Sequence, residues 1–355
     1  MSTAINERIV NWIVKRAKKE YADDIAMVLA YGSFVNGTAN AKSDVDCYFI
    51  PKTERGYQFS VSFILNDIGY DIFPMSWERV ENISNLKDVL LPCVGDARVL
   101  FYSTNEDLEK FNRLKNKMFF NLRDSQYIKE IAKKRFTFAC NLYARMKTYN
   151  QLSDIRTCAG YIIMALADAV AVYNQDYFHF GLKKQYEDLQ RFKLIPQGFI
   201  EDYLSVMKAE TAAESQYYCD RILKSVSRYM EWEFIIENEA EERNNKNNKL
   251  PDYAALAALY EEISSTFNKI YVCCEEKNYV LGFLSAACLQ RELKEASQEN
   301  NVPYYDIMGA FCYDNLFLLA EKTKKIEAHF VQMIMNGGGN IKRFSDFEDF
   351  EKTIL

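Results

Sequence analysis

Hydrophobic residues near the start of the chain repeat with two different periods, one helical and one extended. Apolar side chains recur at helical spacing over 9–21 and predict a helix there. An unbroken apolar run over 25–30 then predicts a buried strand that stops at Gly32-Ser33. The N-terminal part of the chain is therefore expected to mix helix with sheet.

Apolar and polar residues alternate over 44–50, which predicts a second strand. The two sets are Val45, Cys47 and Phe49 on one face, and Asp44, Asp46 and Tyr48 on the other. Because successive side chains of a strand point to opposite faces, the carboxylates of Asp44 and Asp46 project together.

The rest of the N-terminal part continues the mixture of helix and strand. The pattern predicts a helix around 58–66, a third strand centred on 71–73, and further strand and loop over 90–102. Since Asp71 lies in the third strand, it can bring a third carboxylate to the same face of the sheet.

From about residue 107 the pattern becomes helical. Helices are predicted over 125–150, 153–174, 199–208 and 212–237, with Ser153 as an N-cap, and again over 253–277, 279–298 and 304–335. A polar run over 238–249 interrupts the periodicity before Pro251 restarts a helix. The predicted fold class is α+β, with a short mixed β-sheet in the N-terminal domain and an all-α C-terminal region.

Four units follow from these changes in pattern. They are an N-terminal domain over 1–105, a helical domain over 106–237, a linker or exposed loop over 238–251, and a second helical segment over 252–355. The helical domain is expected to close one side of a cleft in the N-terminal domain.

Composition limits the class of protein. The 355 residues carry 44 Lys and Arg against 50 Asp and Glu, a net charge of -6, which argues against a protein that wraps nucleic acid. No apolar run approaches the roughly 20 residues that span a bilayer, and the first residues lack the pattern of a signal peptide. We therefore expect a cytoplasmic protein with no nucleic-acid and no membrane partner.

Cysteine and histidine usage restricts the possible metal chemistry. The nine cysteines show no C-x-x-C spacing, so neither a disulfide framework nor a zinc site is indicated. His179 and His329 are the two histidines of the sequence, and both are assigned to structure. Any metal is therefore expected to be held by oxygen ligands.

One segment carries residues suited to phosphate and metal chemistry. The missing side chain of Gly32 lets a phosphate approach backbone N–H groups, and Ser33 adds a hydroxyl donor. The paired carboxylates of Asp44 and Asp46 suit a hard cation such as Mg²⁺. The segment is not a P-loop, because Thr38 stands where the lysine of that motif would be.

The motif of Gly32-Ser33, then ten residues, then Asp44-Val45-Asp46 resembles the signature of the DNA polymerase beta-type nucleotidyltransferase superfamily. The resemblance includes the later strand acid Asp71 and covers roughly residues 1–105. The helical stretch after it is similar in character and order to the C-terminal domain of kanamycin- and lincosamide-type antibiotic nucleotidyltransferases.

The resemblance implies roles for individual residues. Asp44 and Asp46 would bind two Mg²⁺ ions, and Asp71 would complete the second metal site and act on the acceptor hydroxyl. Gly32 and Ser33 would hold the β- and γ-phosphates of the nucleotide. Lys42, in the same segment, is counted with them as a nucleotide-binding residue.

Two further features concern the helical domain. Many members of the superfamily carry a basic residue where Asn36 stands. The resemblance therefore implies either weaker triphosphate binding or a cation borrowed from the Lys- and Arg-rich stretch over 110–147, in which Lys133, Lys134 and Arg135 are the most clustered. The alternative is that this stretch is a solvated helix face. Asp168 lies in a very apolar helix and is a candidate catalytic base, or else an acid at the helix surface or paired with a nearby Arg or Lys.

The implied activity is Mg²⁺-dependent transfer of a nucleoside monophosphate from a nucleoside triphosphate, with ATP expected, to a hydroxyl of a small molecule, with release of pyrophosphate. An aminoglycoside-like antibiotic is the expected acceptor, which would make the protein an antibiotic-resistance enzyme of the EC 2.7.7 type. The alternatives are a regulatory nucleotidyltransferase of antitoxin type that modifies a protein, and a nucleotide-binding module without turnover. The acidic balance disfavours a polymerase acting on RNA ends.

Overall fold

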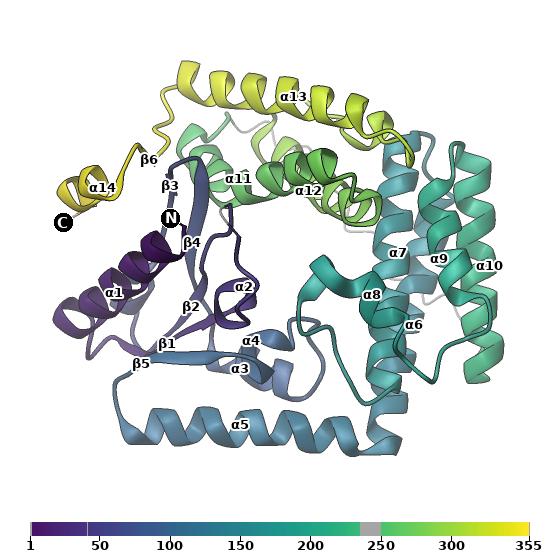
Figure 1. Ribbon diagram of the computed structural model, residues 1–355, viewed down its shortest axis with the longest axis horizontal. Coiled ribbons are helices and arrows are strands. Elements are labelled where there is room, and N and C mark those ends of the chain that lie inside the picture. The colour runs from purple at the N-terminus through teal and green to yellow at the C-terminus, as the bar shows by residue number, and fades with distance from the viewer. Residues whose placement is uncertain (1, 41, 235–249, 355) are drawn as a thin grey trace.

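The computed structural model describes residues 2–40, 42–234 and 250–354. Most of the predicted linker, residues 238–249, lies outside the described residues. Figure 1 shows a β-sheet near the two termini and a larger helical part on the other side of the molecule. The predicted α+β class is confirmed.

The sheet has six strands in the order β5-β1-β2-β4-β3-β6. Their bounds are β1 Ile25–Tyr31, β2 Asp46–Pro51, β3 Val61–Leu65, β4 Ile68–Pro74, β5 Arg98–Tyr102 and β6 Arg343–Phe344. β2 runs parallel to β4 and antiparallel to β1, and β3 runs antiparallel to β4. The sheet is therefore mixed, as predicted.

The predicted helix over 58–66 is wrong. A 3₁₀ helix, η1 Arg55–Phe59, is followed directly by the strand β3. Asn66 and Asp67 both adopt positive φ angles, of 51° and 61°, and so form a tight hairpin turn between β3 and β4. The turn and the pairing with β4 decide the conformation of this segment against its helical periodicity.

Both faces of the sheet are buried. The helices α1 Ser2–Glu20 and α14 Phe347–Ile354 cover one face, where the core includes Val28, Phe49 and Phe63. The other face, with Met27, Leu29 and Tyr48, packs against the helices α3 Trp77–Ser84, α4 Pro92–Gly95 and α5 Asn105–Arg123. The alternation of side chains along each strand thus supplies two separate cores.

The helical part is built around one apolar helix. Its first elements are α6 Ser125–Met146, α7 Leu152–Tyr173, η2 Gly181–Lys184, α8 Gln185–Leu189, α9 Phe199–Lys208 and α10 Ala212–Met230. Gln151, not the predicted Ser153, is the N-cap of α7. α7 is long and apolar enough to cross a membrane, contrary to the sequence expectation. Most of it is buried inside the molecule among α6, α9, α10 and a later helix, α12 Tyr279–Asn300.

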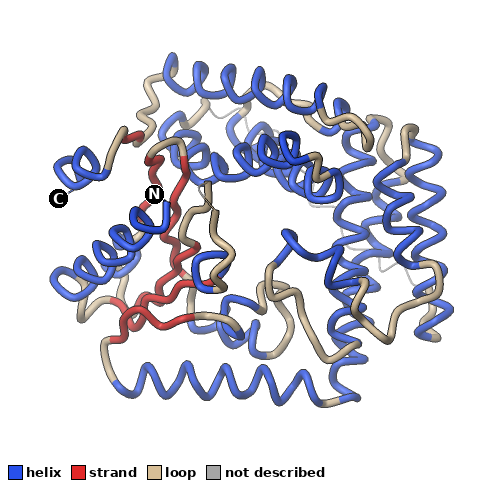
Figure 2. Tube along the Cα trace, in the orientation of Figure 1, coloured by secondary structure: helices blue, strands red, loops and turns tan. Residues whose placement is uncertain are grey.

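The last part of the chain forms helices and then returns to the sheet (Figure 2). The elements are α11 Tyr253–Glu276, α12 Tyr279–Asn300, η3 Met308–Ala310 and α13 Phe317–Asn336, followed by β6 and α14. The predicted helix over 304–335 is wrong in its first part, since the Asp306 carboxylate accepts a bond from the Gly309 N–H and stabilises a turn. The side chains of α6, α7 and α9–α13 share one core.

α11 joins the helical part to the sheet. It packs across β3 and β4, where a side chain at Gly69 would overlap the hydroxyl of Ser264. The Asn268 amide donates a hydrogen bond to the Asp67 carbonyl at 2.5 Å. These contacts place one face of α11 beside the end of the sheet that carries the predicted site.

Candidate active site

The site begins where β1 ends and the short helix α2 Gly32–Val35 starts at once. Gly32 has a φ of 71°, a conformation that other residues rarely adopt. A Cβ at this position would also overlap the carboxylate oxygen Oδ2 of Asp46. Glycine is therefore required by its backbone angle and by the Asp46 side chain that lies against the turn.

The three predicted acids meet at one end of the sheet. Asp46 is the first residue of β2 and pairs with Tyr31 of β1. The parallel register of β2 and β4 joins Cys47 to Ile72, so Asp46 stands beside Asp71. The carboxylates of Asp44, Asp46 and Asp71 are all half-buried. We call these three residues the acid triad.

Electrostatic effects show that the acid triad is crowded. Burial raises the pKa of Asp46 to about 7, and the negative charge of Asp44 raises it as well. Burial also raises the pKa of Asp44. The pKa of Asp71 is raised by burial and by Asp44, against a hydrogen bond of 3.0 Å from the Ser62 hydroxyl. Because neighbouring negative charges repel one another, these three carboxylates would ionise together more easily with a bound cation.

α11 contributes two charged residues that the sequence analysis missed. The charge of Lys269 lowers the pKa of both Asp44 and Asp46. Glu262 lies seven residues earlier, about two turns along the helix, so it shares a face with Lys269. Burial, together with the charges of Asp71 and Glu292, raises the pKa of Glu262 to about 7. Part of the Glu262 residue is nevertheless exposed to solvent.

The predicted nucleotide-binding residues occupy the rim of the site. Ser33 is half-buried, and its carbonyl accepts a bond from the Thr38 N–H at 3.0 Å. Lys42 is exposed and forms an ion pair of 3.4 Å with Glu275 of α11. An exposed pair of this kind adds little stability, so the ammonium group is available to a ligand.

Asp168 is placed beside a basic residue. The Arg135 guanidinium donates to the Asp168 carbonyl at 3.1 Å and also to the carbonyls of Leu86 and Asp88. Burial raises the pKa of Asp168 to about 6, and Arg135 opposes that rise. Arg135 therefore bonds to the backbone of Asp168, and its charge acts on the carboxyl group. The role of Asp168 as a base stays a prediction.

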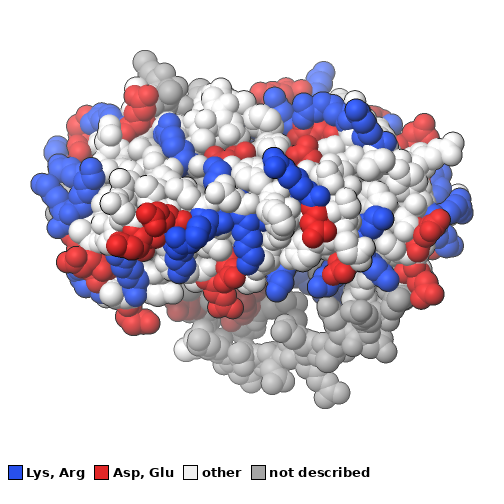
Figure 3. Space-filling view, turned by 90° about the horizontal axis from the view of Figure 1, so that it is seen from below, with Lys and Arg blue, Asp and Glu red and all other residues white. Residues whose placement is uncertain are grey.

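The basic stretch over 110–147 does not act as a unit. Lys133 and Lys134 are exposed, whereas Arg135 is engaged by backbone carbonyls. Figure 3 shows the face below the view of Figure 1, on which basic and acidic side chains are interspersed. This distribution agrees with a solvated helix face. The cation of the helical part whose charge acts on Asp44 and Asp46 is Lys269.

The acid triad offers only oxygen donors, the ligand type that Mg²⁺ prefers. Within the part of the chain that the structure describes, no three His, Cys, Asp or Glu side chains are already close enough together to enclose a metal ion. The chemistry of the donors and their unbalanced charge fit a divalent cation shared between the protein and a nucleotide.

Comparison with known proteins identifies the domain that carries this site. Residues 10–123 match the model of the nucleotidyltransferase domain family, a range that spans β1 to β5 and includes the acid triad. This part of the chain is a nucleotidyltransferase domain of the polymerase beta type, as predicted. The protein is accordingly a transferase of the EC 2.7.7 type, from a family that generally uses a nucleoside triphosphate and a divalent metal.

One solved structure is similar to this chain at low identity. It is a nucleotidyltransferase-like protein from Exiguobacterium sibiricum 255-15, 13% identical, and the match covers 61% of this chain and 78% of that chain with a TM-score of 0.33. No curated protein matches the sequence. The resemblance to antibiotic-modifying enzymes stays a prediction.

Proposed function

We propose that the protein transfers a nucleoside monophosphate from Mg²⁺-bound ATP, or another nucleoside triphosphate, to a hydroxyl of a small molecule in the cytoplasm. The observation that carries the proposal is the acid triad, three half-buried carboxylates at one end of the sheet beside Gly32. Their raised pKa values are the expected cost of a site built to receive cations.

Asp44 and Asp46 would hold the metal with help from Asp71. When bound, Mg²⁺ would neutralise the triphosphate and stabilise the entering and leaving oxygens. The protein supplies the surroundings for this chemistry. Gly32 keeps the turn open towards Asp46, and the hydroxyl and backbone N–H of Ser33 are the donors for the terminal phosphates.

The acceptor is expected to enter between Asp71 and Glu262. In the proposed reaction the acceptor oxygen forms a bond to the α-phosphorus, the bond to the β-phosphate oxygen breaks, and pyrophosphate leaves. The hydroxyl proton passes to a carboxylate. Asp71 and Glu262 are our candidates for this role, because the pKa of each is raised above its ordinary value and the charge of Asp71 acts on Glu262. Asp168 stays a second candidate.

The charge around Glu262 favours a cationic acceptor. Glu262 of α11 and Glu292 of α12 make the electrostatic potential more negative on that side of the site. An acceptor with amino groups beside its hydroxyls, such as an aminoglycoside, would be attracted to this side. Antibiotic modification is the form of the proposal that this charge supports.

The proposal is tested by incubating the protein with α-labelled nucleoside triphosphates, Mg²⁺ and a panel of aminoglycosides and lincosamides. Thin-layer chromatography and a protein gel then follow the label. We expect label on a small molecule. Label on a protein would favour the regulatory alternative, and no label from any triphosphate on any acceptor would contradict the proposal.

A further inference from the structure

A loop of the helical part contacts the turn that follows α2. The Asn36 amide donates a hydrogen bond of 3.3 Å to the His179 carbonyl. The Lys183 ammonium donates a bond of 3.2 Å to the Thr38 carbonyl. Because the Thr38 N–H is itself bonded to the Ser33 carbonyl, these contacts reach the residues proposed to hold the triphosphate.

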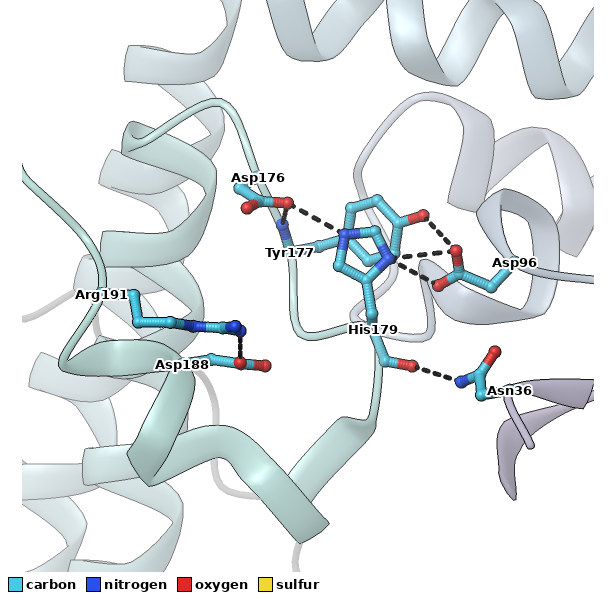
Figure 4. A network of polar contacts seen from close by, with 7 residues as sticks. All are labelled: Asn36, Asp96, Asp176, Tyr177, His179, Asp188 and Arg191. Atoms are coloured by element: carbon cyan, nitrogen blue, oxygen red, sulfur yellow. Dashed lines mark hydrogen bonds and ion pairs between the residues drawn. The ribbon is translucent and has the colours of Figure 1, made fainter. Parts of the chain in front are cut away.

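The side chain of His179 is bound on both sides by carboxylates (Figure 4). Its Nδ1 lies 2.9 Å from one oxygen of Asp96 and 3.0 Å from the other, and its Nε2 lies 3.2 Å from Asp176. A neutral imidazole has one nitrogen that accepts, and that nitrogen would face a carboxylate oxygen, which also accepts. The doubly protonated ring is the form that satisfies both contacts.

The partner Asp96 is fixed to the nucleotidyltransferase domain. It follows α4 directly, and α4 is tied to β2 by a 2.6 Å bond from the Tyr48 hydroxyl to the Cys93 carbonyl. Tyr177 donates to Asp96 at 3.0 Å, and its hydroxyl occupies the space where Gly95 lacks a side chain. The other partner, Asp176, belongs to the loop after α7.

We propose that His179 is a positioning residue whose imidazolium bridges Asp96 and Asp176, holds the loop over 176–184 against the turn over 32–38, and thereby sets the affinity for the nucleoside triphosphate. His179 does not touch the nucleotide in this inference, which rests on the proposed function. It goes beyond the structural role that the sequence analysis assigned to His179.

The charges around the ring determine how the contact depends on pH. Hydrogen bonds to Asp176 and Asp96 raise the pKa of His179 to about 9, against burial, which lowers it. The other groups that face this cluster are Tyr177, whose pKa is raised, and Arg191, which lowers the pKa of Asp176. Protonated His179 therefore stabilises the contact between the loop and the turn fully below its ordinary pKa of 6.5, and this stabilisation is lost as the pH rises through about 9.

The test compares wild type with His179→Gln and Asn36→Ala. Calorimetry measures the Kd of Mg²⁺ and a non-hydrolysable ATP analogue, and hydrogen exchange measures the protection of residues 32–38. Since one hydrogen bond contributes about 0.5–1.5 kcal/mol, we expect each variant to weaken nucleotide binding by about two- to tenfold. Exchange over 32–38 should accelerate, and KM for the triphosphate should rise more than kcat falls.

A pH series separates positioning from general stability. Wild-type affinity should weaken as the pH passes about 9, whereas His179→Gln should lack that step. The matched control is His329→Gln, because His329 bonds to Tyr305 at 2.8 Å on another side of the helical part. Asn36→Ala removes the hydrogen bond to the His179 carbonyl without changing the charged cluster. It therefore tests whether the contact between the loop and the turn sets nucleotide affinity, even if His179→Gln fails to fold.

The outcomes distinguish the inference from the proposed function. Nucleotide binding by wild type with unchanged Kd, exchange and pH profile in His179→Gln and Asn36→Ala would overturn the inference alone. Absence of nucleotide binding by wild type would overturn the proposed function. In that case hydrogen exchange over 32–38 still tests whether the loop over 176–184 holds this turn. Unchanged exchange in both variants would refute that contact.

Discussion

Gly32 connects the backbone of the α2 turn to the carboxylate chemistry of the site. Gly32→Ala would force a Cβ into the Asp46 carboxylate and strain a φ of 71°. We expect a stability loss of about 1–3 kcal/mol from the backbone strain, together with a large loss of nucleotidyl transfer. Urea unfolding and the labelled-nucleotide assay measure the two effects. Gly338→Ala is the control for strain alone, since Gly338 also has a positive φ but no atoms near its missing side chain, and it lies outside the site.

Asp46 predicts how metal binding depends on pH. Its pKa is raised to about 7, so a proton must leave before the carboxylate can hold a cation. We expect Mg²⁺ affinity to increase as the pH rises through about 7, because protons and metal compete for the same oxygens. Thermal unfolding with and without Mg²⁺ at pH 6 and pH 8 measures this. The same Mg²⁺ response in Asp46→Asn as in wild type would show that the metal binds elsewhere.

At the scale of elements, local pattern was enough to predict the strands that carry the acid triad. β1, β2 and β4 follow from apolar runs and alternation. The strand predicted over 44–50 begins only at Asp46, so Asp44 precedes it, and the register of β2 and β4 sets Asp71 beside Asp46. Glu262 and Lys269 could not be found in this way, because nearly two hundred residues separate them from the strands they approach. The periodicity of an amphipathic helix does not indicate which distant strands its polar face contacts.

β3 and β6 show two other limits of the sequence. The β3 segment carried an apparent helical period, and the hairpin turn at Asn66 and Asp67 decided against it. β6 is two residues long, Arg343–Phe344, and has no period to detect. Its place beside β3 comes from backbone pairing, including a 2.8 Å bond from the Ile64 N–H to the Lys342 carbonyl.

The position of Lys269 on α11 leads to a separate prediction about the pKa of Asp44 and Asp46. Removing this cation in Lys269→Met should raise the pKa of Asp44 and Asp46 further, because its charge now lowers both. The pH at which Mg²⁺ begins to stabilise the protein should therefore move upwards. Lys325→Met, at an exposed position on α13, is the matched control. An unchanged pH response would mean that Lys269 does not act on the acid triad.

At the scale of the whole molecule, the C-terminus completes the N-terminal domain. Phe350 of α14 is fully buried, with ring centroids 4.9 Å from Trp12 and 4.3 Å from Phe63. We expect Phe350→Ala to lower the free energy of unfolding by about 3–5 kcal/mol, as for other buried aromatic side chains. Urea denaturation measures the loss. Phe317→Ala is the control because 67% of the Phe317 surface is exposed, and an equal effect of the two changes would contradict the packing.

Three regions of the chain meet around the acid triad. The nucleotidyltransferase domain supplies the acid triad, the loop after α7 is hydrogen-bonded to the turn over 32–38, and α11 lies against β3 and against β4, which carries Asp71. The matched family covers the first of these regions. The helical part is where we expect the acceptor to be selected, since Glu262 and Glu292 come from it.

The central claim is that the acid triad performs nucleotidyl transfer. Its most direct test is the rate at which label moves from an α-labelled triphosphate to an acceptor in wild type, Asp46→Asn and Asp67→Asn. Asp67 is an exposed acid in the turn between β3 and β4, where a positive φ suits asparagine equally well. The account predicts a loss of orders of magnitude for Asp46→Asn at unchanged folding, and near-normal transfer for Asp67→Asn. Near-normal transfer by Asp46→Asn would contradict it.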